Sequence, residues 1–136
     1  MSKKHTARCA CCAVKFGFDV DPDFVAVCHC LHCQTASGCE AATFLGVPEN
    51  DFTLLSGQPK AFHYTAASAR DGTATSAPTA ARDCLAATWA FRARSLVAIG
   101  NLGNPEGIRP MLEMFVNRRL IWATPLDLPQ FDATPG

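Results

Sequence analysis

The distribution of cysteine limits what this chain of 136 residues can fold into more than any other feature. Seven of the eight cysteines lie within the first 39 residues, and only Cys84 stands apart. In a small secreted protein, such a set would indicate a disulfide framework. Here the basic N-terminus is not followed by the apolar stretch of a secretory signal, so we expect a cytoplasmic protein. In a reducing compartment, crowded thiols more often bind a metal.

The composition fits one globular domain over residues 1–136. Its 49% of hydrophobic residues is too high for a disordered chain, and the length suits a single domain. Twelve basic residues offset twelve acidic ones, which argues against a partner that is a nucleic acid. The longest apolar run, residues 9–14, is far shorter than the roughly 20 residues of a bilayer span, so we expect no membrane partner. The sequence leaves the oligomeric state open.

Short apolar patterns predict a mainly β fold. Residues 14–20 alternate strictly, which places Val14, Phe16, Phe18 and Val20 on one buried face of a strand. Helical periodicity is limited to one turn within residues 32–38, and residues 65–81 form either a loose hairpin or a loop. Further short strands are expected at residues 24–27, 42–46, 52–55, 61–65, 88–92, 95–99, 112–116 and 120–122. We therefore expect a single compact domain of short antiparallel sheets.

The sequence CHCLHC at residues 28–33 joins a CxC to a CxxC through a shared cysteine. In an extended segment Cys28 and Cys30 point the same way, and the CxxC turn brings Cys33 to the same point with little loop-closure cost. Thiolates bind zinc at about 2.3 Å, and a set of three leaves the fourth position open, as in catalytic zinc sites. The motif therefore predicts a zinc site with room for a further ligand.

The alternative for these cysteines is a disulfide or a set of inert thiols. A bridge between Cys28 and Cys30 would close a very short, strained ring. A bridge between Cys30 and Cys33 is more feasible and is similar to redox CxxC motifs. Those motifs normally open a helix in a βαβ unit, which this sequence does not indicate, so we favour a metal.

A second group of thiols precedes the first predicted strand. Cys9 and Cys11 could share a face and meet Cys84 across the fold, but a closed structural zinc site has four ligands. The position where a CxxC would supply the fourth is Ala87, and Cys12 points opposite to Cys11 in a straight strand. Whether this second zinc site is filled stays open.

Polar side chains near the thiols are candidates for chemistry. His32, inside the CHCLHC motif, and Glu113, a carboxylate among apolar residues, are the candidates for proton transfer. A carboxylate in such a strand more often faces solvent, and the alternative is that Glu113 is a base or a ligand near the metal. His29 should point away from its flanking cysteines, next to the site or in solvent. We expect Cys39 and Trp122 to pack in the core.

Several motifs occur in a fixed order between about residues 8 and 135. They are the CxC at residues 9–11 before Val14-Lys15-Phe16, the CHCxxCQ at residues 28–34 with Gly38, then Arg82 and Cys84, Trp122, and the DLPxF at residues 127–131. Together they resemble the glutathione-dependent formaldehyde-activating enzyme and centromere protein V family. The resemblance implies a β-tent-like fold, a catalytic zinc on Cys28, Cys30 and Cys33, and a structural zinc on Cys9, Cys11 and Cys84.

The chain departs from the family pattern at four positions. Cys12 replaces the glycine after the first CxC, and Ala87 and Thr88 replace the end of a later CxxC and its following glycine. Glu113 replaces a histidine near the C-terminus. These departures affect the structural zinc site first and the catalytic pocket second.

The resemblance implies zinc-dependent chemistry of the carbon–sulfur lyase type. A small thiol such as glutathione would enter the open zinc position beside formaldehyde or another small aldehyde, or the reverse cleavage would occur. Three thiolates leave zinc electron-rich, which favours thiol capture over water activation. The alternatives are a non-catalytic zinc module for protein–protein contact and a thiol redox or metal-handling protein, since Cys12 and Cys39 are spare.

Overall fold

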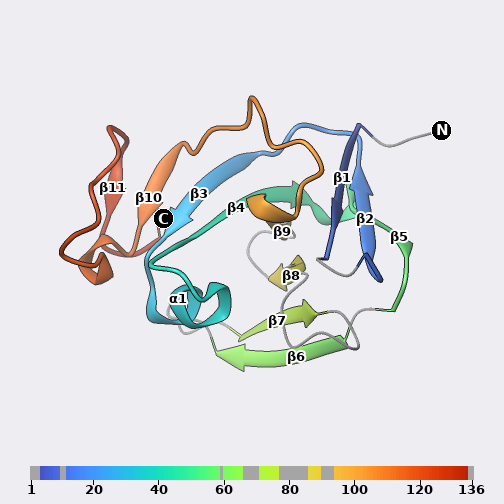
Figure 1. Ribbon diagram of the computed structural model, residues 1–136, viewed down its shortest axis with the longest axis horizontal. Coiled ribbons are helices and arrows are strands. Elements are labelled where there is room, and N and C mark those ends of the chain that lie inside the picture. The colour runs from blue at the N-terminus through green and yellow to red at the C-terminus, as the bar shows by residue number, and fades with distance from the viewer. Residues whose placement is uncertain are drawn as a thin grey trace.

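A computed structural model describes residues 4–9, 12–58, 60–65, 71–76, 86–89 and 94–134, with side chains for residues 4–9, 12–58 and 95–134. In these ranges the protein forms two β-sheets, one α-helix and three short 3-10 helices (Figure 1). The prediction of a mainly β fold is confirmed. No helix among the described residues has the length and apolar character needed to cross a membrane.

The larger sheet has eight strands in the order β11-β10-β3-β4-β9-β8-β7-β6. They are β3 (Phe24–Cys28), β4 (Ala42–Pro48), β6 (Lys60–Thr65), β7 (Asp71–Ser76), β8 (Ala86–Trp89), β9 (Arg94–Ala98), β10 (Leu112–Met114) and β11 (Gln130–Phe131). All pairs are antiparallel except those of β10, which runs parallel to both β3 and β11. The expectation of antiparallel sheets therefore holds away from β10.

The smaller sheet and the helices complete the fold. The sheet has the order β1-β2-β5 and consists of β1 (His5–Arg8), β2 (Lys15–Phe18) and β5 (Thr53–Ser56). Helix α1 (Leu31–Ser37) connects β3 to its antiparallel neighbour β4. The 3-10 helices are η1 (Glu49–Asp51), η2 (Ile99–Asn101) and η3 (Val116–Arg118). Figure 1 shows the smaller sheet on one side of the molecule, with β10 and β11 on the other.

Strand β3 is the centre of the core because both of its faces are covered. Ala26 and Cys28 belong to one buried cluster, together with Cys30, Cys33, Phe44, Leu96 and Met114. Val25, on the opposite face, packs in a second cluster with Ala7, Phe18, Leu45, Val47, Val97 and Leu102. The three cysteines of the CHCLHC motif are therefore part of the hydrophobic core.

Several sequence predictions change in the structure. Residues 120–122 form a turn rather than a strand, and the last strand is instead β11. Ile121 is fully exposed and Trp122 is 68% exposed, so neither side chain packs against a sheet. Cys39 is also exposed, so the core positions predicted for Cys39 and Trp122 are wrong. Strand β1 was not predicted. Within residues 65–81, the described part pairs as antiparallel strands, β7 with β6, and residues 66–70 and 77–81 lie outside the described residues.

Candidate metal centre and its surroundings

The junction between β3 and α1 brings three cysteines together. Cys28 is the last residue of β3, Cys30 is the N-cap of α1, and Cys33 lies in the first turn of that helix. The Cys30 sulfur accepts a hydrogen bond from the Cys33 backbone amide at 3.3 Å, as a short polar side chain does at an N-cap. The helix ends at Gly38, whose left-handed φ of 70° suits a glycine.

The sulfur atoms of Cys28, Cys30 and Cys33 all lie within 4.8 Å of one another, and all three residues are buried. Around a tetrahedral zinc with ligands at about 2.3 Å, sulfur atoms are about 3.8 Å apart, so this set fits the ion with a small adjustment. The prediction that the three thiols converge is confirmed, and the cluster could hold a metal ion.

The pKa values of the three thiols shift in different directions. Hydrogen bonds from Cys28 and Cys33 lower the pKa of the Cys30 thiol far below its usual range. The hydrogen bond to Cys30 raises the pKa of Cys28, and hydrogen bonds to Cys28 and Cys30, together with burial, raise the pKa of Cys33. Of the three, the Cys30 thiol therefore loses its proton most readily, and a bound cation would favour the thiolate form of all three.

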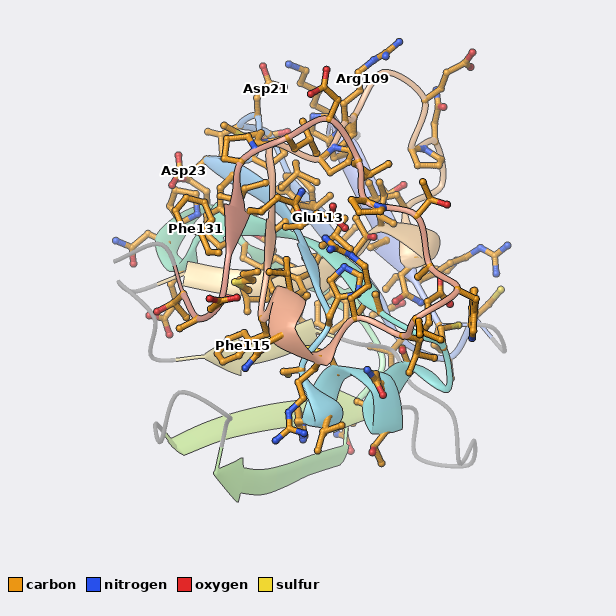
Figure 2. The ribbon with its side chains drawn as sticks, turned by 90° about the vertical axis from the view of Figure 1, so that its left-hand side faces the viewer. Asp21, Asp23, Arg109, Glu113, Phe115 and Phe131 are labelled. Carbon is orange, nitrogen blue, oxygen red and sulfur yellow. The ribbon has the colours of Figure 1, made fainter. Side chains whose placement is uncertain are left out.

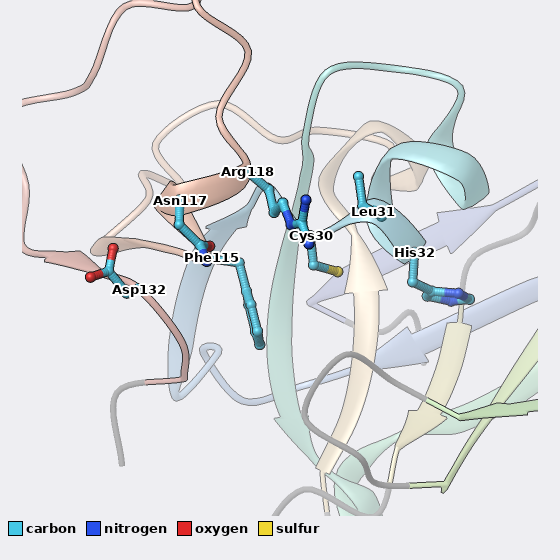
Figure 3. Close-up of a pocket in the computed structure, with 7 residues that line it drawn as sticks. All are labelled: Cys30, Leu31, His32, Phe115, Asn117, Arg118 and Asp132. Carbon is cyan, nitrogen blue, oxygen red and sulfur yellow. The ribbon is translucent and has the colours of Figure 1, made fainter.

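A cavity of about 370 Å³, the Cys30 cavity, opens beside the cluster (Figure 3). Its walls come from the start of α1 on one side and from residues 115–132 on the other, and they include Cys30, His32, Phe115, Asn117, Arg118 and Asp132. Of the two residues predicted for proton transfer, His32 lines this cavity and Glu113 does not. Among the described residues, the Arg118 guanidinium makes no ion pair, so it could meet an anionic ligand.

Glu113 lies on the other face of the sheet. Strand β10 aligns Met114 with Cys28 and Glu113 with Val27, and successive side chains of a strand point to opposite faces. We call the face with Cys28 and Met114 the cysteine face, and the face with Val27 and Glu113 the carboxylate face. Glu113 is 2% exposed; Figure 2 shows it inside the molecule, whereas Asp21 and Arg109 lie at the surface.

The Glu113 carboxylate meets four hydrogen-bond donors. Its Oε1 lies 2.8 Å from Nε2 of His29, while Oε2 accepts from Arg119 Nη2 at 3.0 Å, the Leu126 amide at 2.9 Å and Gln130 Nε2 at 2.7 Å. Burial by itself would raise the pKa of Glu113, but hydrogen bonds from His29, Gln130 and Leu126, with the charge of Arg119, lower it to about 2. Glu113 is therefore a buried carboxylate anion with every oxygen occupied.

His29 lies on the carboxylate face, as the prediction that it points away from its flanking cysteines requires. Its side chain is 4% exposed and contacts Glu113 rather than solvent. A second cavity of about 410 Å³, the His29 cavity, lies on this face and is also lined by Glu40 and Trp122. The contact between His29 and Glu113 joins residues 84 positions apart, and nothing in the local sequence pattern signals it.

Only part of the second predicted metal site falls within the described residues. Cys9 is fully buried and its sulfur accepts a hydrogen bond from the Val14 amide at 3.3 Å, whereas Cys11 and Cys84 lie outside the described residues. Cys12 is exposed and takes a left-handed φ of 65°, the conformation that favours glycine. That is the position where the family pattern has its glycine.

Most of the sequence matches one known protein family. The model of the glutathione-dependent formaldehyde-activating enzyme family matches residues 4–118, which is most of the chain and includes all three clustered cysteines. The match ends just before Arg119 and the C-terminal residues that contact Glu113. Curated proteins gave no match. The extent of the family match shows that the chain belongs to the glutathione-dependent formaldehyde-activating enzyme family.

Proposed function

We propose that this protein is a zinc-dependent carbon–sulfur lyase. Its substrate would be the adduct of a small thiol, such as glutathione, with formaldehyde or another small aldehyde. The observation that carries this proposal is the position of the three-sulfur cluster, which contributes Cys30 to the wall of an open cavity. A purely structural metal site would have no need of such an opening.

In this proposal Cys28, Cys30 and Cys33 hold the zinc. Three thiolates on a divalent cation leave one negative charge and an open fourth position. When bound there, zinc would supply the acidity that makes a thiol nucleophilic at neutral pH. Because an incoming thiolate adds a second negative charge, a cation at the cavity wall would favour its binding, and Arg118 lines that wall.

His32 is the residue that we assign to proton transfer. In adduct formation, the sulfur bonds to the carbonyl carbon, the C=O π electrons pass to oxygen, and the thiol proton ends on that oxygen. His32 lines the Cys30 cavity and could accept the thiol proton at an imidazole nitrogen and deliver it to the oxygen. In cleavage the same steps run backwards, and His32 takes the proton from the hydroxyl.

Glu113 has no such part in this proposal. Its two oxygens already accept hydrogen bonds from four donors, and it does not line the Cys30 cavity. We propose in addition that residues 1–136 form one domain, that the protein acts in the cytoplasm, and that it has neither a nucleic acid nor a membrane as partner. A second zinc on Cys9, Cys11 and Cys84 remains a prediction.

The test combines binding with turnover. The zinc-loaded protein is mixed with glutathione and formaldehyde, and S-hydroxymethylglutathione is followed in both directions by NMR exchange. We expect exchange faster than in buffer, and slower exchange in His32→Ala, which keeps all three sulfur ligands. Cys39→Ala, a change at an exposed thiol outside the cluster, should behave like the wild type. Exchange no faster than in buffer would contradict the proposal.

One observation favours a thiol redox function as a second candidate. The CxxC does open a helix, with Cys30 at the N-cap, although the flanking strands β3 and β4 are antiparallel and not the parallel pair of a βαβ unit. Incubation with oxidised glutathione would separate the two functions. If metal-free protein forms a reversible bridge between Cys30 and Cys33 and purified protein carries no zinc, the redox function is favoured over the lyase.

A further inference from the structure

We propose that Glu113 is a positioning residue that holds the metal loop, residues 28–33, in its ligating geometry through His29. The same carboxylate fastens the C-terminal segment, residues 119–130, to that loop. The inference rests on the proposed function in one respect, namely that this loop binds the zinc. Glu113 touches neither the clustered sulfurs nor the Cys30 cavity, so any effect on the metal must pass through another residue.

His29 is the residue through which Glu113 acts, because it lies between two of the three ligands. Three contacts fix it: its amide donates to the Met114 carbonyl at 3.1 Å, its carbonyl accepts from Gln34 Nε2 at 2.9 Å, and its ring meets Glu113 at 2.8 Å. An ionised carboxylate can only accept, so His29 Nε2 carries the proton. With backbone and ring both held, the directions of the Cys28 and Cys30 side chains are set.

The carboxylate charge is essential to this arrangement. Glu113 and His29 are both nearly fully buried, and Arg119, whose side chain is 16% exposed, supplies the opposite charge. A neutral amide at position 113 would present a donor group to several other donors and would leave Arg119 without its anion. Breaking a buried ion pair in this way costs more than the pair contributes, because one charge remains uncompensated.

The C-terminal segment is fastened at the same point. Arg119, Leu126 and Gln130 all donate to Glu113 Oε2, and Arg119 also donates to the Gln130 side-chain oxygen. From the loop side, Gln34 Nε2 bridges to the Arg118 carbonyl at 3.0 Å. Arg118 and Asp132, which line the Cys30 cavity, thus flank the segment that the carboxylate holds.

The experiment compares Glu113→Gln with a matched control, Glu40→Gln. Glu40 is an exposed carboxylate that lines the same His29 cavity and has no hydrogen bond to His29 in the described structure. Zinc affinity is measured by chelator competition, cobalt(II) absorption reports the ligand geometry, and thermal unfolding of the metal-free proteins monitors the fold. We expect Glu113→Gln to bind zinc about 10-fold or more weakly, with shifted cobalt bands, and Glu40→Gln to match the wild type.

Variants of His29 separate positioning from a general loss of structure. His29→Gln retains a donor near the Nε2 position and should keep most of the zinc affinity, whereas His29→Phe should lose it. If Glu113 acts through His29, the double variant His29→Phe/Glu113→Gln should bind zinc no more weakly than the worse single variant. These variants also carry the test if Glu113→Gln does not fold.

Each outcome has a defined meaning. Wild-type zinc affinity and cobalt bands in a folded Glu113→Gln protein would overturn the positioning role alone, as would equal affinities in His29→Gln and His29→Phe. If the glutathione adduct exchanges no faster than in buffer while the variants show the expected zinc affinities, the lyase function is overturned and the positioning role is supported. A wild-type protein that binds no zinc would overturn both.

Discussion

The two faces of the sheet at β3 and β10 hold opposite kinds of site. On the cysteine face, three buried sulfurs lie within 4.8 Å of one another beside an open cavity, so the cluster could hold a cation and a further ligand. On the carboxylate face, both oxygens of Glu113 accept hydrogen bonds, from four donors in all. A metal cluster with an open position can bind a reactant, whereas a carboxylate held by four hydrogen bonds keeps the surrounding segments in place. The two sites lie on different faces because successive side chains of a strand point to opposite sides of the sheet.

The largest expected effect comes from removing a ligand on the cysteine face. Cys30→Ala should lose zinc from this cluster, and with it the stabilisation that bound metal provides, about 4 kcal/mol when free zinc exceeds the Kd by 1,000-fold. Metal analysis and thermal unfolding measure both quantities. Cys39→Ala is the matched control, since Cys39 is exposed and outside the cluster. Full retention of zinc by Cys30→Ala would remove the distinction between the two faces.

The carboxylate face can be tested by acid titration of the metal-free protein. The folded-state pKa of Glu113, about 2, lies below the unfolded value near 4.5, so its stabilisation is present above about pH 4.5 and is lost as the pH falls toward 2. The loss should be on the order of 3 kcal/mol. Denaturant unfolding at several pH values should therefore give a steeper acid loss for the wild type than for Glu113→Gln.

A second carboxylate with a lowered pKa, that of Asp21, serves as the control for this titration. Contacts with Lys4 and His5 lower the pKa of Asp21, but the side chain of that residue is 73% exposed to solvent. Asp21→Asn should thus change the acid dependence much less than Glu113→Gln does. Equal effects of the two substitutions on the acid dependence would mean that burial of Glu113 does not increase its contribution to stability.

A smaller effect is expected at the wall of the Cys30 cavity. Arg118→Ala should weaken glutathione binding about 5-fold, roughly 1 kcal/mol, without changing the zinc content, because it removes a cation near the incoming thiolate. Isothermal titration at low and high salt measures this, and the difference between the proteins should shrink at high salt. Arg109→Ala removes an exposed cation that does not line this cavity and should bind like the wild type.

An effect of similar size concerns Cys12, the residue with a left-handed backbone conformation next to the second thiol group. Cys12→Gly should stabilise the protein by about 1 kcal/mol, because a φ of 65° strains a residue with a Cβ. Cys12→Ala retains the strain and should give no such gain. Chemical denaturation of the three proteins distinguishes them, and equal stability of the glycine and alanine variants would show that the conformation carries no strain.

Local sequence patterns predicted those features of the structure that depend on residues close together in the sequence. The alternation at residues 14–20 predicted β2, and the spacing of Cys28, Cys30 and Cys33 predicted their convergence. Both follow from backbone geometry within a few residues.

Features that depend on distant partners were not predicted. The parallel alignment of β10 with β3 and the contact between His29 and Glu113 join segments more than 80 residues apart, and no local pattern encodes such a pairing. For the same reason residues 120–122 were wrongly assigned to a strand. Their apolar side chains suggested burial, but the segment is attached through the Leu126 amide and Gln130 instead.

The most direct test of the account is the number of sulfur atoms around zinc before and after a thiol is added. X-ray absorption at the zinc edge of the Cys9→Ser protein, in which any second site on Cys9, Cys11 and Cys84 is weakened, measures that number for the cluster of Cys28, Cys30 and Cys33. We expect three sulfurs and one lighter ligand without glutathione, and four sulfurs with it. Four sulfurs before addition, or three after saturation with glutathione, would contradict an open position at this metal.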